Sequence, residues 1–92
     1  MIFVSLKKSD RADKKYVIVF KEPNTTIHFG SKNSKTYLDH GDKTIRENYI
    51  KRHRLNNEDW NKINAGSLSR YLLWGDSTDL NKNLKAYLKR MT

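Results

Sequence analysis

Two segments in the first thirty residues, Ile2–Leu6 and Thr25–Phe29, carry apolar side chains with a period of two, which is typical of β-strands. This alternation predicts strands at Ile2–Leu6 and Thr25–Phe29. Between them, Tyr16–Phe20 is apolar at every position and rich in β-branched and aromatic residues, so we expect it to be the central strand. The turns at Ser9–Asp13 and Glu22–Asn24 are short, which favours a three-stranded antiparallel meander. One face of the first strand is expected to carry Ile2, Val4 and Leu6.

A polar segment at residues 31–41 separates these strands from a helical half. Its composition favours a loop that crosses from the sheet to the helices, with Tyr37 and Leu38 as its anchors. Because Tyr37 lies among polar residues, we expect it to be the most exposed of the large aromatic side chains.

Beyond this loop the apolar residues recur at the 3.6-residue spacing of helices, and three helices are expected. In the first helix Thr44 and Glu47 fit a capping box, and Leu55–Asn57 breaks the pattern. In the second helix Ser67 is the expected cap, and Gly75 the expected end. The side chains expected to face the core from these two helices are Ile45, Tyr49, His53 and Trp74.

The last helix has the clearest amphipathic pattern, and Ser77 or Thr78 is its expected cap. Its apolar residues lie within about 100° of arc, so this face is expected to dock on the sheet. Three lysines lie on the opposite side, within roughly 60° of each other. The apolar residues are Leu80, Leu84, Tyr87, Leu88 and Met91, and the lysines are Lys82, Lys85 and Lys89.

These elements predict an α+β fold, in which an N-terminal three-stranded antiparallel sheet is followed by about three helices packed on it. We expect one small basic domain over residues 1–92, whose working surface is a face or a groove. The absence of cysteine excludes disulfides and cysteine-based zinc sites. No apolar run approaches the ~20 residues that span a bilayer, and the basic residues of the N-terminus follow its apolar ones, the reverse of a signal peptide. We therefore expect no membrane association.

Charge narrows the choice of partners. The chain has 19 Lys and Arg against 10 Asp and Glu, a net charge of +9. The first 41 residues hold eight basic and four acidic residues, and the remaining 51 hold eleven and six, so the excess is spread through the fold. Such a charge attracts polyanions without sequence recognition, which favours nucleic acid, and an acidic protein surface is the alternative partner.

The lysine face of the last helix is the leading candidate for phosphate contacts, because residues 80–91 contain no acid. A second basic cluster follows Tyr49 on the first helix, where Arg52 and His53 have a structural role as an alternative to binding. The residues that we expect to contact nucleic acid are Lys51, Arg52, Arg54, Arg70, Lys82, Lys85, Lys89 and Arg90.

No motif indicates a metal site, a cofactor or catalysis. His28, His40 and His53 come from different expected elements, and no HxxxH or HExxH spacing brings them together with Asp39. The chain has no nucleophile elbow, phosphate-binding loop or glycine-rich dinucleotide turn. We expect no enzyme, and a minimal nuclease that uses Glu47 with Arg52 and His53 is the lesser alternative.

Four short motifs carry a family resemblance: Phe29–Gly30, the YxxRH of Tyr49–His53, the AGxLSR of Ala65–Arg70, and Leu73–Trp74. Their combination resembles a family of small uncharacterised proteins encoded by large nucleocytoplasmic DNA viruses of amoebae and algae. The resemblance implies a viral origin and no mechanism. It leaves open whether the shared positions form a site or a folding core; these are His28–Gly30, Arg52–His53, Ala65–Gly66 and Ser69–Arg70.

The leading hypothesis is therefore a non-enzymatic nucleic-acid-binding accessory protein of a large DNA virus, with DNA favoured over RNA. It would act in the host cytoplasm or nucleus, or be packaged in the virion. The alternative hypothesis is a structural or interaction module of the virion that binds an acidic protein. The oligomeric state is left open.

Overall fold

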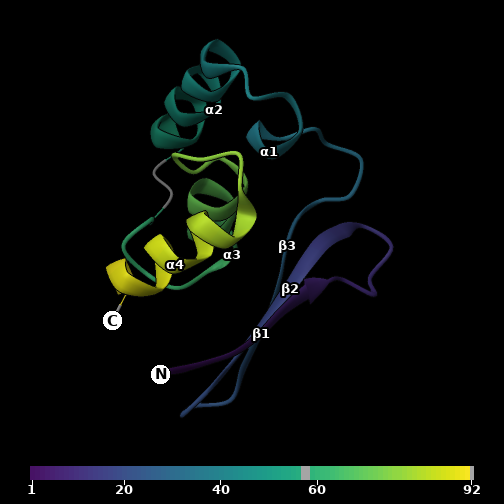
Figure 1. The fold of residues 1–92 in the computed structure, drawn as a ribbon, viewed down its shortest axis with the longest axis vertical. Coiled ribbons are helices and arrows are strands. Elements are labelled where there is room, and N and C mark those ends of the chain that lie inside the picture. Colours follow the sequence, from purple (N-terminus) through teal and green to yellow (C-terminus); the bar gives the residue numbers. More distant parts are fainter. Residues whose placement is uncertain (57–58, 92) are drawn as a thin grey trace.

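The sheet has the predicted meander topology. A computed structural model describes residues 1–56 and 59–91, and its three strands are β1 (Ile2–Lys8), β2 (Lys14–Lys21) and β3 (Thr25–Ser31). They pair antiparallel in the order β1-β2-β3, so the apolar β2 lies at the centre (Figure 1). The expected central strand and both expected turns are confirmed.

The side chains of β1 point to different faces from those predicted, because the strand contains a bulge. Phe3 pairs with Phe20 and Ser5 pairs with Val19, which leaves Val4 as an extra residue in β1. A bulge breaks the two-residue alternation. Phe3 and Leu6 therefore pack against the core, whereas Ile2 and Val4 are 43% and 50% exposed. The prediction that Ile2, Val4 and Leu6 share one face was wrong, because Leu6 packs against the core while Ile2 and Val4 are exposed.

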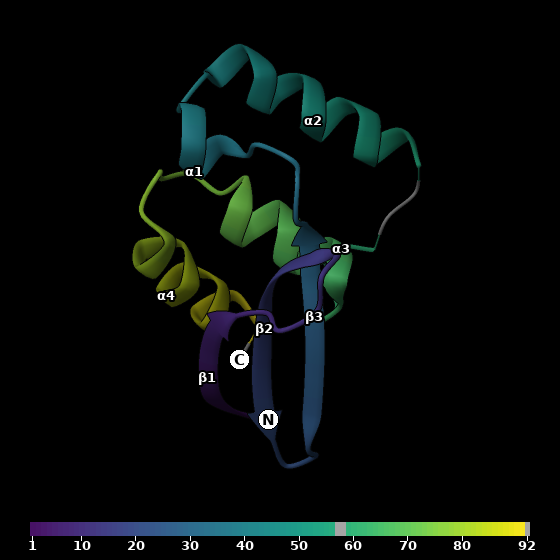
Figure 2. The ribbon, with the colours of Figure 1, turned by 90° about the vertical axis from the view of Figure 1, so that its right-hand side faces the viewer.

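The helical half begins with α1 (Tyr37–His40) and α2 (Lys43–Leu55), and continues through α3 (Ala65–Leu68) and α4 (Leu80–Met91). Between α3 and α4 a π-helical turn, η1 (Ser69–Leu73), follows α3 directly, and the Trp74 N–H donates to the Ser69 carbonyl over 3.0 Å. The α+β fold is thereby confirmed. Figure 2 shows α3 lying between the sheet and α2, with α4 on the β1 side of the molecule.

The apolar face of α4 was expected to dock on the sheet, but it packs mainly against η1. Tyr87 is buried there, and Leu84 and Leu88 are partly buried against the core. The α3–η1 segment lies directly on β3 and so occupies the place that was expected for α4. The chain's most buried side chains come from both halves, and they include Ile18, Phe20, Phe29, Leu68, Leu72 and Tyr87.

Three helices begin at residues other than their expected caps: α2 and α3 start earlier, and α4 starts later. Asp42 caps α2, because its Oδ1 accepts hydrogen bonds from the Thr44 and Ile45 N–H groups over 2.9 and 3.2 Å. Asn64 caps α3, and Asp79 accepts from the first-turn N–H groups of α4. A carboxylate or amide oxygen directly before the first turn satisfies its free donors. The expected caps that were wrong are Thr44, Ser67, and Ser77 or Thr78.

The polar segment at residues 31–41 is not a simple loop. Thr36 and Asp39 form a capping box that starts α1, and the hydrogen bond from the Thr36 N–H lowers the pKa of the Asp39 carboxyl. Tyr37 is only 6% exposed, and the Arg46 guanidinium lies 5.5 Å from its ring centroid. The prediction that Tyr37 is the most exposed aromatic residue was therefore wrong.

None of the helices in residues 1–56 and 59–91 is long and apolar enough to cross a membrane.

Candidate nucleic-acid interface

The lysines of α4 form an exposed basic face, which consists of Lys82, Lys85 and Lys89. All three side chains are exposed, while Asn83 and Tyr87 are buried on the opposite side of the helix. The predicted division of this helix into an apolar and a basic face is confirmed. The three ammonium groups lie on the side of α4 away from the core, in a helix that contains no acid.

A pocket of two arginines and two tyrosines adjoins this basic face. The cavity has a volume of about 430 Å³, and its charged and aromatic lining residues are Arg70, Tyr71, Asp76, Tyr87, Lys89 and Arg90. The Arg90 guanidinium carbon lies 4.3 Å from the centroid of the Tyr71 ring, and that of Arg70 lies 4.9 Å from it. Two guanidinium groups thus share one aromatic ring, which holds both positive charges beside the lysines of α4.

Arg70 was expected to contact phosphate, and the structure shows that it is also held by the fold. Its Nη1 donates to the Trp74 carbonyl over 2.9 Å, and its guanidinium lies 5.4 Å from the centroid of the Trp60 ring. Burial, with the nearby positive charge of Arg46, lowers the pKa of Arg70. Arg70 is only partly exposed, so Lys89 and Arg90 are the more accessible cations of this pocket.

Arg46 is a structural residue that motif reasoning did not assign. Its Nε donates to the Trp74 and Gly75 carbonyls over 3.2 and 2.9 Å, and its Nη2 contacts the Asp76 carboxylate at 2.7 Å. Arg46 thereby ties α2 to the turn that follows η1. No local pattern reveals this role, because its partners lie about thirty residues further along the chain.

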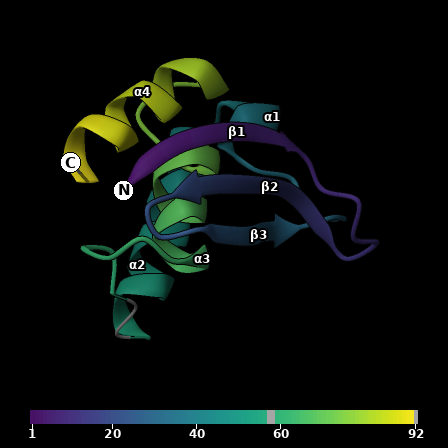
Figure 3. The same cartoon turned by 90° about the horizontal axis from the view of Figure 1, so that it is seen from below.

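The basic residues of α2 form a separate group. Lys51, Arg52 and Arg54 are all exposed. Figures 2 and 3 show that the C-terminal end of α2 lies on the β3 side of the sheet, whereas α4 lies on the β1 side. The eight predicted residues therefore fall on two surfaces: the structure brings Arg70 to Lys89 and Arg90, and it does not bring the α2 group to them.

A groove runs between α2 and α3, and we name it the α2–α3 groove. Its volume is about 720 Å³, and the end of β3 and the segment before α1 complete its walls. Ile45 lines the groove and is 44% exposed, although the sequence placed it toward the core. Positive charge and small residues both contribute to the lining, which includes Lys14, Lys35, Arg52, His53, Ala65 and Gly66.

An aromatic stack supports one wall of this groove. The rings of His53 and Tyr49 lie 4.0 Å apart, and those of Tyr49 and Trp74 lie 4.3 Å apart and are nearly parallel. Tyr49 and Trp74 are buried, which confirms the expected core position of Trp74, and His53 is partly exposed. The structural role considered for His53 is present in this stack.

The residues considered for metal binding or nuclease chemistry do not come together. The His28 Nδ1 lies 2.7 Å from the Ser9 Oγ, while the His40 Nδ1 accepts from the Asp42 N–H over 2.9 Å. Within residues 1–56 and 59–91, no three histidine or carboxylate side chains are grouped as metal ligands. Of the nuclease candidates, His53 lines the groove with Arg52, but Glu47 does not.

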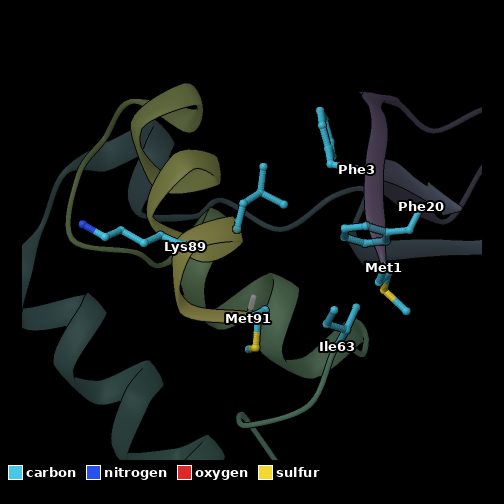
Figure 4. A pocket seen from close by; sticks show the side chains of 7 residues that line it. Met1, Phe3, Phe20, Ile63, Lys89 and Met91 are labelled. Atoms are coloured by element: carbon cyan, nitrogen blue, oxygen red, sulfur yellow. The ribbon is translucent and has the colours of Figure 1, made fainter. Parts of the chain in front are cut away.

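A third hollow lies between the start of β1 and the end of α4. Its volume is about 350 Å³, and Figure 4 shows Phe3 and Phe20 on one side, with Met91 and Ile63 below. Its lining is mainly apolar. Lys89 extends from α4 away from the strand, so its ammonium group belongs with the basic face and not with this hollow.

Most of the shared motif positions line the α2–α3 groove, whereas His28, Phe29 and Arg70 do not. Arg52 and His53 reach it from α2, and Ala65, Gly66 and Ser69 reach it from the α3–η1 segment. Residues three or four positions apart lie on the same side of a helix, which accounts for the spacing of the residues in the YxxRH and AGxLSR motifs.

Residues 4–53, more than half of the chain, match a protein family described as a family of unknown function, DUF5754. The matched segment ends at His53, so it includes Arg52 and excludes α3 and α4. Comparison with curated proteins and with solved structures gave no match.

Proposed function

We propose that this chain, which belongs to a family of unknown function (DUF5754), is a non-enzymatic nucleic-acid-binding accessory protein. It contacts phosphates through its basic helices and has little sequence specificity. The resemblance described above extends the proposal to an accessory protein of a large DNA virus, in the host cytoplasm or nucleus or packaged in the virion.

The exposed basic face of α4 carries the proposal. Lys82 and Lys89 are seven residues apart, which is about 10 Å along a helix that rises 1.5 Å per residue. Duplex DNA presents about six phosphate charges over that length. Because the residues of α4 include no acid, no neighbouring carboxylate within the helix neutralises these lysines.

The pocket that Arg70 and Arg90 line beside α4 supports the same role. Arg90 stands beside Lys89, and the ring of Tyr71 holds its guanidinium in place. Lysine and arginine contacts to phosphate position a protein on nucleic acid without reading bases, which is why we expect little sequence preference.

The test is fluorescence anisotropy with labelled duplex DNA, single-stranded DNA and RNA across a salt series. Replacing Lys82, Lys85 and Lys89 with Gln should lower the slope of log affinity against log salt for duplex DNA by about 2.7, or about 0.9 per phosphate contact. The matched control replaces three other exposed lysines, Lys7, Lys21 and Lys43, with Gln and has the same net charge. The control should lose much less affinity.

Equal losses in the two triple variants would mean that net charge, and not the α4 face, governs binding. No binding of any nucleic acid at low salt would reject the proposal and leave an acidic protein surface as the partner to pursue.

A further inference from the structure

We infer that the α2–α3 groove receives one unpaired nucleotide of a single-stranded nucleic acid, with its phosphate on the basic rim and its base on the ring of His53. The inference rests on the proposed function and adds to it a second contact site and a preference for single strands over duplexes.

The charge of the rim determines the class of ligand. Lys14, Lys35 and Arg52 reach the groove from three different parts of the fold, and Asp13 is the one acid among the described residues that line it. Positive side chains that converge from separate elements on one cavity favour an anionic group such as a phosphate.

The wall of the groove adds a surface for a flat ring. His53 continues the stack that runs through Tyr49, and Ile45, which is 44% exposed, adds an apolar side chain to the groove about two helical turns away on α2. Bases of single-stranded nucleic acids stack on aromatic side chains, histidine included. The carboxylates of an acidic peptide would satisfy the cations of the rim, but they carry no flat ring, whereas in a nucleotide the phosphate and the ring belong to one unit.

The opposite wall allows close approach. Ala65 and Gly66 contribute almost no side chain, and Ser69 follows them one turn later on the same side. The groove volume of about 720 Å³ lies within the range of small-molecule sites and suits a single nucleotide. In a duplex the bases are paired and stacked, so their faces are not available to this wall.

The deciding variant is Ala65→Glu, which places a carboxylate in the groove. Ala65 is exposed at the first position of α3, where an acidic residue favours the helix, so the fold should be retained. The control is Ala12→Glu, the same change at an exposed position outside the groove lining. A second pair removes one positive charge from α2: Arg52→Gln at the groove, and Arg54→Gln, which does not line it.

Affinities of these proteins for a labelled twelve-nucleotide oligothymidylate and for a duplex of equal length are measured by anisotropy, after circular dichroism has confirmed folding. The wild-type protein should prefer the single strand. Ala65→Glu should weaken single-strand binding at least tenfold and duplex binding by less than threefold, and Arg52→Gln should lose more single-strand affinity than Arg54→Gln. In NMR spectra, thymidine monophosphate should shift the Gly66 and Ser69 amides more than inorganic phosphate does.

Equal effects of Ala65→Glu and Ala12→Glu would overturn the groove site, even if the triple lysine variant of α4 still loses binding. Displacement of the oligonucleotide from the groove by hexaglutamate, with the same amides shifted, would replace the nucleotide with an acidic peptide. If no nucleic acid binds at all, the proposed function fails together with this inference.

Discussion

Ser67 and Tyr87 form a hydrogen bond in the core, with the Ser67 Oγ 2.8 Å from the Tyr87 hydroxyl oxygen. The Ser67 hydroxyl also donates to the Asn64 carbonyl over 3.1 Å, so the Tyr87 hydroxyl is the donor in the bond between them. Both side chains are buried, at 0% and 1% exposure. This bond joins the first turn of α3 to α4, which sets the position of the helix that presents the basic face.

The two partners of this bond should differ in their effect on stability. Ser67→Ala leaves the buried Tyr87 hydroxyl without its acceptor and should lower the free energy of unfolding by about 2 kcal/mol. Tyr87→Phe removes the donor, while Ser67 keeps its bonds with Asn64, so the loss should be about 1 kcal/mol. Urea unfolding of both variants measures the difference. A larger loss in Tyr87→Phe would contradict the assigned direction of the bond.

Stability should also fall at alkaline pH because of Tyr87. Burial raises the pKa of Tyr87 above its ordinary value of 10.0. In the unfolded chain this hydroxyl ionises near its ordinary pKa, whereas in the folded protein it stays neutral to higher pH. The stability that it contributes is therefore present below about pH 10 and is lost as pH rises further. Urea unfolding between pH 9 and 11 should show a shallower decline for Tyr87→Phe than for the wild type; parallel declines would contradict this.

Arg46 should matter for stability far more than its ion-pair partner does. Its guanidinium donates to two backbone carbonyls as well as to Asp76, whose side chain is 98% exposed. Arg46→Lys loses the planar fork that makes these contacts and should lower the free energy of unfolding by about 2 kcal/mol. Asp76→Asn should have no measurable effect, because exposed ion pairs contribute little. Similar losses in the two variants would mean that the ion pair carries the effect.

Gly75→Ala should be among the most damaging small substitutions. A Cβ at this position would lie 2.7 Å from the Asn83 Cγ and would also clash with the Tyr71 carbonyl oxygen. Asn83 cannot move aside easily, because its side-chain amide bonds the backbone of Leu72 and Ser77. We expect a loss of about 3 kcal/mol.

The control for this substitution is Gly41→Ala. Gly41 has a φ of 62°, but a Cβ there would make only an ordinary contact at 3.5 Å with Thr78. Its cost should be about 1 kcal/mol, from the left-handed backbone alone. Thermal unfolding of the two variants compares them, and an equal loss would show that Gly75 is not sterically restricted.

Features that depend on residues close in sequence were predictable. The apolar β2 identifies itself as the central strand, and the 3.6-residue period of α4 is enough to place Lys82, Lys85 and Lys89 on one exposed face. The bulge at Val4 was not predictable from β1 alone, since it arises from the register with β2. In the sequence, Ile2, Val4 and Leu6 keep their two-residue spacing through the bulge, so nothing in β1 itself marks its position.

Features that depend on distant residues were not predictable from periodicity. Tyr37 is buried because it lies in α1, where a loop was expected, and because Arg46 packs on its ring. Ile45 faces the α2–α3 groove because α3 lies opposite it, and the chain has no local signal for that arrangement. The α4 face could therefore be proposed from sequence, whereas the groove required the fold.

The π-helical turn of η1 makes the middle of this chain sensitive to length more than to side-chain identity. Removing one residue from Ser69–Leu73 would convert η1 into an ordinary helical turn and rotate everything after it by about 100° about the helix axis. Trp74 would leave the ring of Tyr49, and the carbonyls that Arg46 holds would turn away. An insertion or deletion in this turn should therefore cost more than a conservative substitution at any one of its positions, the buried Leu72 and Leu73 included.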